Sequence, residues 1–159
     1  MKVLVCLDRS DQSLSVLEKS IDIAKWQKAE MVLVTVVEDF IDFGEGIPPD
    51  FQEALLAEGQ KALNGAQAKA QAAGLSARTI LRSGPSPADA ILTCAEEELP
   101  DLIVMGSRTK SGLDRFLIGS VASKVVSHAY CSVMVLRSGE IPPAKKSKPT
   151  DPNLEGFPA

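Results

Sequence analysis

Apolar and polar positions follow two different patterns along the chain, and their alternation predicts strands separated by helices. Continuous or nearly continuous apolar runs are typical of strands that are buried on both faces. Such runs predict strands at residues 3–7, 31–37, 101–106 and 131–136. A segment that is less apolar, residues 76–82, predicts a further strand. Helical spacing of apolar residues, helix-favouring composition and capping residues predict the intervening helices. The first two helices are expected to begin after Ser10 or Asp11 and at Phe51, and Gly74 suits the end of the second. The other two are expected to begin after Ser86, with Pro87 in the first helical position, and at Ser120.

This order of elements predicts an α/β fold in which a parallel sheet is covered by helices on both faces. All of the predicted strands and helices lie within residues 1–137, so one domain is expected there. Residues 138–159 are rich in proline and lysine and contain few large apolar side chains. That composition predicts a disordered tail.

Composition and charge argue against several classes of protein. Hydrophobic residues make up 45% of the 159 positions and charged residues 24%, which is typical of a soluble globular protein. The net charge of −4 argues against a nucleic-acid-binding surface. No apolar run is long enough to cross a membrane, and the first residues become polar too early for a signal peptide, so a cytoplasmic protein is expected. Cys6, Cys94 and Cys131 lie in separate apolar segments without metal-binding spacing, which predicts buried, reduced thiols.

Candidate chemistry lies where the predicted strands end. In an open parallel sheet, ligands bind beyond the carboxyl ends of the strands, and Asp8 directly follows the first of them. The segment from Gly106 to Ser120 follows the fourth strand and carries three cations, Arg108, Lys110 and Arg115. Gly106 would let the chain turn sharply, and Gly119 and Ser120 would open a helix whose free amides and positive dipole end suit an anion. A carboxylate for a ribose and a helix start for a phosphate together describe a mononucleotide site.

The same residues also fit a simpler interpretation. Gly119 and Ser120 could form an ordinary helix start, Asp8 could be a cap or an ion-pair partner, and the cations could be solvated. Glycine-rich loops produce many false positives, so the pattern alone leaves both interpretations open. The P-loop pattern G-x-x-x-x-G-K-[ST] and the dinucleotide pattern G-x-G-x-x-G do not occur, which argues against P-loop NTPases and dinucleotide-dependent dehydrogenases.

Over residues 3–136 the chain resembles the universal stress protein family. The segments VLVCLDRSDQS, DLIVMGSR and SGLDRFLIGSVASKVV carry the resemblance. The last two cover the region where the family has the pattern G-x-x-G, nine residues and then G-[ST]. The resemblance implies a Rossmann-like three-layer sandwich of the adenine nucleotide alpha hydrolase-like type, with a five-stranded parallel sheet of order 3-2-1-4-5. It also implies an adenine nucleotide at the carboxyl edge of the sheet. The implied binding residues are Cys6, Leu7 and Val36 at adenine, Asp8 at ribose, Met105 and Gly106 under the ribose-phosphate turn, Arg108 and Thr109 in the phosphate loop, and Gly119, Ser120, Val121 and Ala122 at phosphate.

Two departures from the family pattern bear on the ligand. Thr109 stands at the second glycine of the pattern, and Ala122 stands where nucleotide-binding relatives often carry a hydroxyl. A β-branched residue resists positive φ and adds bulk near the terminal phosphates. We therefore expect AMP or ADP to bind as well as ATP. A magnesium ion is expected only if nucleotide phosphates hold most of it.

The sequence contains no clear catalytic set. The only histidine, His128, is predicted late in the last helix, away from the pocket. At most, slow ATP hydrolysis is expected.

The composition of the last predicted strand indicates a protein partner. The run of residues 131–136, from Cys131 to Leu136, is expected at an edge of the sheet, and an apolar edge must be covered or paired. The resemblance implies pairing with the same strand of a second copy, which gives a homodimer. The favoured function is a nucleotide-responsive stress regulator that acts on an unidentified protein partner. Alternatives are a dimeric stress-linked interaction module without nucleotide and, with less support, a slow ATPase.

Overall fold

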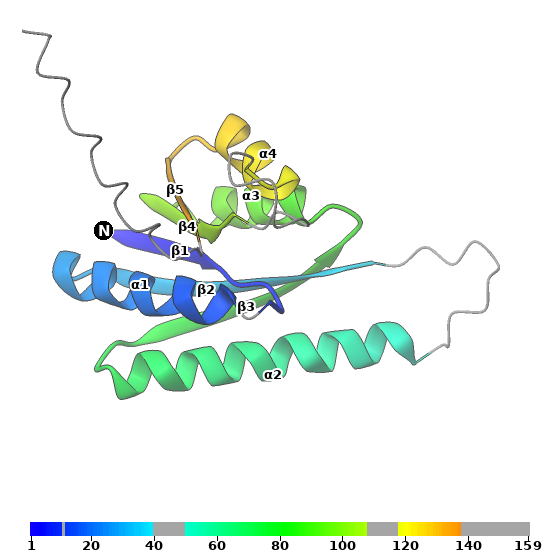
Figure 1. Ribbon diagram of the computed structural model, residues 1–159, viewed down its shortest axis with the longest axis horizontal. Coiled ribbons are helices and arrows are strands. Elements are labelled where there is room, and N and C mark those ends of the chain that lie inside the picture. Colours follow the sequence, from blue (N-terminus) through cyan, green and yellow to red (C-terminus); the bar gives the residue numbers. More distant parts are fainter. Residues whose placement is uncertain (11, 40–49, 108–117, 138–159) are drawn as a thin grey trace, which may run out of the picture.

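The computed structural model describes residues 1–10, 12–39, 50–107 and 118–137, in which parallel strands alternate with helices (Figure 1). The elements are β1 (Lys2–Cys6), α1 (Gln12–Gln27), β2 (Glu30–Glu38), α2 (Phe51–Ala72), β3 (Ala77–Gly84), α3 (Pro87–Glu98), β4 (Leu102–Gly106), α4 (Ser120–His128) and β5 (Ser132–Leu136). The predicted tail, residues 138–159, lies outside these ranges. None of the helices in the described part of the chain is long and apolar enough to cross a membrane.

The strands form a five-stranded sheet of order β3-β2-β1-β4-β5, and each neighbouring pair is parallel. This confirms the expected α/β class and strand order. The order reverses beside β1, which lies between β2 and β4. In that register Cys6 pairs with Val34 on one side and with Met105 on the other, so these three residues lie side by side at the carboxyl edge of the sheet.

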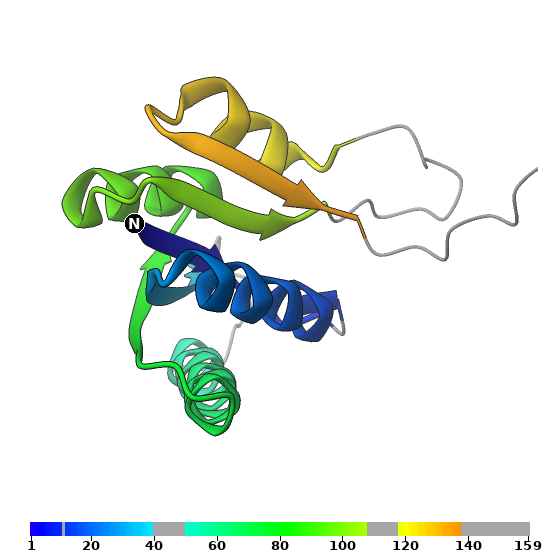
Figure 2. The same ribbon diagram turned by 90° about the vertical axis from the view of Figure 1, so that its left-hand side faces the viewer.

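Helices cover both faces of the sheet (Figures 1 and 2). Successive residues of β1 point to opposite faces, because the side-chain period of a strand is two. Val3 and Val5 pack in one core with residues of α1 and α2, whereas Leu4 and Cys6 pack in the other with residues of α3 and α4. The near-continuous apolar runs follow from this arrangement, since a strand between two helical layers has no polar face.

Local signals set the helix ends. Ser86 Oγ accepts a hydrogen bond from Asp89 N at 3.4 Å, and Pro87 occupies the first turn of α3. Gly74 follows α2 with a φ of 83°, a left-handed conformation that glycine adopts without strain. Both helix boundaries agree with the sequence analysis. β3 extends two residues beyond the predicted end at residue 82, because β2 continues beside it as far as the Glu38–Gly84 pair.

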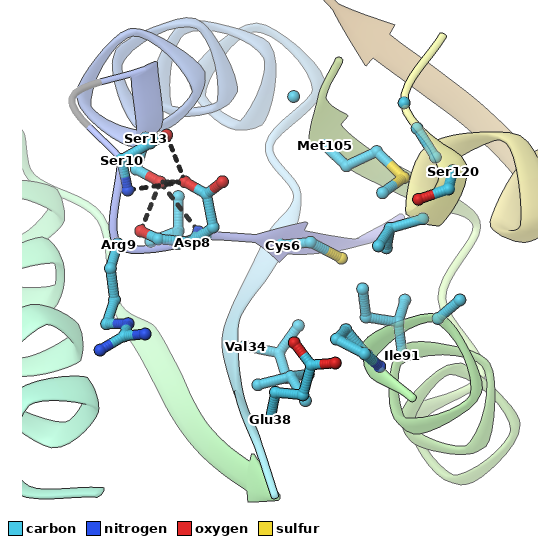
Figure 3. A pocket seen from close by; sticks show the side chains of 18 of the residues that line it. Cys6, Asp8, Arg9, Ser10, Ser13, Val34, Glu38, Ile91, Met105 and Ser120 are labelled. Carbon is cyan, nitrogen blue, oxygen red and sulfur yellow. Dashed lines mark hydrogen bonds between the residues drawn. The ribbon is translucent and has the colours of Figure 1, made fainter. Parts of the chain in front are cut away.

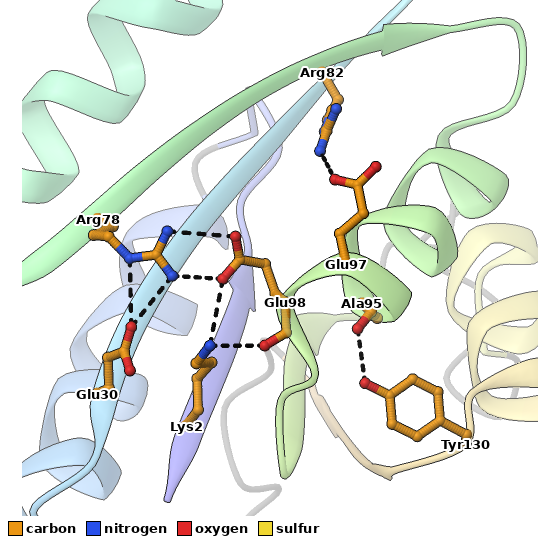
Figure 4. Close-up of polar contacts among 8 residues, drawn as sticks. All are labelled: Lys2, Glu30, Arg78, Arg82, Ala95, Glu97, Glu98 and Tyr130. Atoms are coloured by element: carbon orange, nitrogen blue, oxygen red, sulfur yellow. Dashed lines mark hydrogen bonds and ion pairs between the residues drawn. The ribbon is translucent and has the colours of Figure 1, made fainter.

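Ion pairs tie α3 to the strands (Figure 4). The Arg78 guanidinium on β3 pairs with Glu98 at the end of α3 and with Glu30 at the start of β2. Lys2 Nζ on β1 lies 3.5 Å from the Glu98 carboxylate and donates to its backbone oxygen at 2.7 Å. Further along β3, Arg82 pairs with Glu97. The outer strand β3 is thus lined by guanidinium groups that carboxylates hold in place.

Candidate functional site

A cavity of about 1130 Å³ opens at the carboxyl edge of the sheet, between the strand ends and the starts of α3 and α4. Ten of the twelve predicted site residues line it: Cys6, Leu7, Asp8, Val36, Met105, Gly106, Gly119, Ser120, Val121 and Ala122. The other two, Arg108 and Thr109, lie outside the described residues, as do Lys110 and Arg115. The fold therefore brings together residues that are more than a hundred positions apart in the chain.

The floor of the cavity is apolar. Cys6, Val34, Val36 and Met105 come from three adjacent strands and lie on the face of the sheet that α3 and α4 cover. Burial raises the pKa of the Cys6 thiol far above its usual range. The thiol is therefore neutral at physiological pH and contributes apolar surface rather than a nucleophile. A floor of this kind suits a flat apolar ring.

Leu7 contributes to the cavity in another way. Its side chain packs in the opposite core, with residues of α1 and α2. Its backbone N–H donates to Val34 O at 2.9 Å, and its carbonyl oxygen accepts from Thr35 Oγ1 at 3.0 Å. The chain is thus held in register with β2 for one residue beyond the end of β1, which sets the position from which Asp8 projects.

Asp8 is fixed in a turn before α1 (Figure 3). Its Oδ1 atom accepts hydrogen bonds from Ser10 N at 3.0 Å, Ser10 Oγ at 2.5 Å and Ser13 Oγ at 2.7 Å. Ser13 Oγ also accepts from Asp8 N at 2.8 Å. This carboxylate therefore has a structural role, because it organises the turn. The same bonds hold the carboxylate at the cavity wall, so they do not oppose a second role in binding.

The start of α4 faces Asp8 across the cavity (Figure 3). Gly119 takes the N-cap position with φ −56° and ψ 154°, and Ser120 is the first helical residue rather than the cap. The first helical bond runs from Ser123 N to Gly119 O at 2.8 Å, so the amides of residues 120–122 precede the internally bonded part of the helix. Because φ at Gly119 is negative, glycine is compatible with close approach of a ligand to this backbone but is not required by a left-handed conformation.

Gly106 behaves differently from the expectation that it allows a sharp turn. It is the last residue of β4 and pairs with Leu136, and the ladder continues as Ser107 N donates to Leu136 O at 2.9 Å. The strand therefore remains extended through Gly106. A Cβ atom at this position would lie 3.4 Å from Val16 Cγ2, a van der Waals contact, so the packing of α1 does not by itself require glycine here.

The sequence analysis did not identify several charged side chains that line the cavity. Arg9 Nη1 lies 3.2 Å from Glu58 Oε2 of α2, and Glu38 ends β2 on the cavity side. Lys124 of α4 also lines the cavity, and its Nζ lies 2.7 Å from the nearer carboxylate oxygen of Asp89. Lys124 follows Ser120 by four residues, a spacing that places both on one helix face. That spacing is the signal that could have identified it.

His128 ends α4 and is not among the described residues that line the cavity. Its Nδ1 atom lies 2.8 Å from Lys124 O. This agrees with the expectation that the histidine lies away from the pocket.

Comparison with known proteins places the chain among its relatives. The "Universal stress protein family" model matches residues 1–137. Universal stress protein MJ0531 of Methanocaldococcus jannaschii is 38% identical over 139 residues, which are 86% of this chain and 81% of that one. Universal stress protein YxiE of Bacillus subtilis is 35% identical over an aligned length of 153 residues, and the match covers 86% of this chain and 98% of that one.

Solved structures share the fold. A universal stress protein in complex with cAMP superposes with a TM-score of 0.67 at 24% identity, over 87% of this chain and 98% of that one. The Arabidopsis thaliana family protein At3g01520, with AMP bound, superposes with a TM-score of 0.67 at 23% identity, over 87% of this chain and 92% of that one. The match of the family model over nearly the whole described chain, supported by these relatives, shows that the chain belongs to the universal stress protein family.

Proposed function

We propose that this protein binds an adenine nucleotide in the cavity at the carboxyl edge of the sheet and acts in the stress response through that binding. The observation that carries the proposal is the pairing of a fixed carboxylate with a helix start across an apolar floor, seen at Asp8, Cys6 and Ser120. These three features match the sugar, base and phosphate of a nucleotide in chemical character. The solved relatives that carry AMP and cAMP lend support.

In the proposed complex the base lies on the apolar floor near Val36, and the ribose hydroxyls donate to the Asp8 carboxylate. The phosphate accepts hydrogen bonds from the amides of residues 120–122 and from Ser120 Oγ, where the helix dipole favours negative charge. Ala122 is buried and offers no hydroxyl to a terminal phosphate. AMP and ADP are therefore proposed as ligands alongside ATP.

Calorimetric titration of the purified full chain with AMP, ADP and ATP tests the proposal. We expect dissociation constants in the micromolar range for the wild type. Asp8→Asn should weaken all three, because the amide keeps an oxygen for the Ser10 and Ser13 bonds but loses the charge that grips the ribose. Gly119→Val should weaken them further by adding bulk at the helix start. A wild-type protein that binds none of the three at millimolar concentration would refute the proposal.

We further propose that two copies associate through β5. This strand is an edge of the sheet, and Met134 in its middle is 38% exposed. The other edge, β3, carries Arg78 and Arg82, which discourage strand pairing, whereas Val133 and Val135 flank Met134 in β5. The apolar edge is the one suited to an isologous, two-fold contact.

Light scattering behind size-exclusion chromatography tests the association. The wild type should elute at twice the chain mass at micromolar concentration. Met134→Lys should shift the mass to that of one chain, because it places a charge in the middle of the apolar edge. Arg78→Lys at the opposite edge serves as the control and should leave the mass unchanged. A wild-type mass of one chain would exclude the dimer.

A further inference from the structure

An ion pair at the cavity wall joins the middle of α4 to the first turn of α3. Lys124 Nζ of α4 lies 2.7 Å from Asp89 Oδ1 and 2.8 Å from Asp89 Oδ2, so one ammonium group contacts both oxygens of the carboxylate. Lys124 lines the cavity, and Asp89 lies in the first turn of α3. The pair thus joins a cavity-lining residue of α4 to the start of α3.

The geometry of α4 directs the lysine toward those amides. Each Cα–Cβ bond of a helix tilts toward the helix N-terminus, so a side chain covers the turn before its own residue. Lys124 is four residues after Ser120, a rise of about 6 Å along the axis. Its four-carbon stem is flexible, so the ammonium group can reach any anion that extends outward from Ser120.

The pair is also easy to break. The side chains of Lys124 and Asp89 are 44% and 56% exposed, and ion pairs that are this exposed contribute little to stability. A phosphate offers the ammonium group a stronger, charge-assisted partner. An incoming phosphate chain can therefore take Lys124 from Asp89 at little cost.

We infer that Lys124 and Asp89 set how strongly the site prefers nucleotides with more phosphates, with Lys124 exchanging Asp89 for the outer phosphate groups. The inference rests on the proposed nucleotide function. Adenosine has no charge for Lys124 to attract, AMP has few, and ATP has most. The contribution of Lys124 should therefore grow with each phosphate, and removing it should leave Asp89 as an unbalanced negative charge that repels the same groups.

The size of the effect follows from Coulomb's law. Two unit charges about 6 Å apart in a water-like dielectric attract or repel by about 0.7 kcal/mol, which corresponds to roughly a threefold change in affinity per charge. Since ATP carries about two more charges than AMP, the ratio of their dissociation constants should change about tenfold when Lys124 loses its charge. Salt screens such a contact, so the effect should shrink at high ionic strength.

The test is calorimetric titration with adenosine, AMP and ATP at low salt in EDTA, so that no divalent cation neutralises the phosphates. In Lys124→Met, adenosine affinity should stay at the wild-type value, AMP should weaken moderately, and ATP should weaken about tenfold more than AMP. Asp89→Asn should shift the ratio in the opposite direction, because it frees Lys124 and removes a repelling charge. The matched control is Lys19→Met, which removes an equal charge from an exposed position on α1, across the sheet from α3 and α4.

The outcomes separate this inference from the proposed function. Equal affinity changes for all three ligands, or no change, in Lys124→Met would overturn the role of Lys124 while leaving nucleotide binding intact. A Lys19→Met variant that shifts the AMP-to-ATP ratio as much as Lys124→Met would show a general charge effect and would overturn it as well. Absence of binding by the wild type would refute the proposed function, and this inference with it.

Discussion

Helix α2 contains two glycines with different surroundings, and changing each to alanine gives a paired measure of how closely the helix packs on the sheet. A Cβ atom at Gly59 would lie 2.9 Å from Leu81 Cδ1 and 3.1 Å from Val37 Cγ2. A Cβ atom at Gly65, six residues further along, would meet nothing within 4 Å. The two substitutions add the same methyl group to the same helix, so they differ only in what that group meets.

Both alanines gain helix propensity, worth about 1 kcal/mol relative to glycine. At Gly65 nothing offsets this gain, so Gly65→Ala should stabilise the protein by about 0.5–1 kcal/mol. At Gly59 the new methyl lies well inside the optimal carbon–carbon separation of about 3.5–4.0 Å. The tip of Leu81 can move, but Val37 is buried and β-branched, so it can yield only by leaving its rotamer. Overpacking of this kind costs about 1–3 kcal/mol, so Gly59→Ala should destabilise by about 1 kcal/mol net.

Urea unfolding followed by circular dichroism measures the difference. With a slope of about 2 kcal/mol per molar urea, the midpoints should move by about 0.5 M in opposite directions. The slopes themselves should stay equal to that of the wild type, which shows that only stability has changed. If Gly59→Ala stabilised the protein as much as Gly65→Ala, helix α2 would not pack on β2 and β3 as closely as described, and the reasoning would be wrong.

Three further predictions concern other parts of the molecule. Because burial raises the pKa of the Cys6 thiol, native protein at pH 8 should react with iodoacetamide at Cys131, which is half-buried, well before Cys6; faster labelling of Cys6 would contradict this. Ser86→Ala should lower the free energy of unfolding by about 0.5–1 kcal/mol, at the low end for a cap because its bond is long, as urea titration can check. The hydrogen bond from Arg78 lowers the pKa of the Glu98 carboxyl in the folded protein. The ionised carboxylate therefore contributes its full stabilisation above pH 4.5, and this stabilisation is lost as the pH falls through the pKa of the folded state. The melting temperature of Glu98→Gln should therefore fall less than that of the wild type between pH 5 and pH 3.

The fold could be predicted from the sequence because its determinants are local and repeated. Each buried strand is read from an apolar run, and Ser86, Pro87 and Gly74 mark helix ends by their own chemistry. Strand ends were less accurate, because they depend on the neighbour. β3 extends to Gly84 because β2 continues beside it, and no residue within β3 could have predicted this extension.

Some residues of the candidate site could likewise be predicted from the sequence, and others could not. Asp8 and Ser120 follow or open predicted elements, so their common edge could be inferred from the topology of a parallel sheet. The Lys124–Asp89 pair could not, because it depends on how α3 and α4 pack against each other. The two serines that bind Asp8 Oδ1 stand close to it in sequence, yet the spacing alone could not show which of its oxygens they would occupy.

The guanidinium groups along β3 have a consequence for how far association can proceed. If two copies join through β5, both free margins of the merged sheet are β3 strands bearing Arg78 and Arg82. Each margin then carries charged side chains that are already held in ion pairs, and a strand added there would have to bury or displace them, which opposes further strand pairing. In the proposed dimer, strand addition would therefore stop after one step and give a closed assembly of two copies instead of an open-ended fibre.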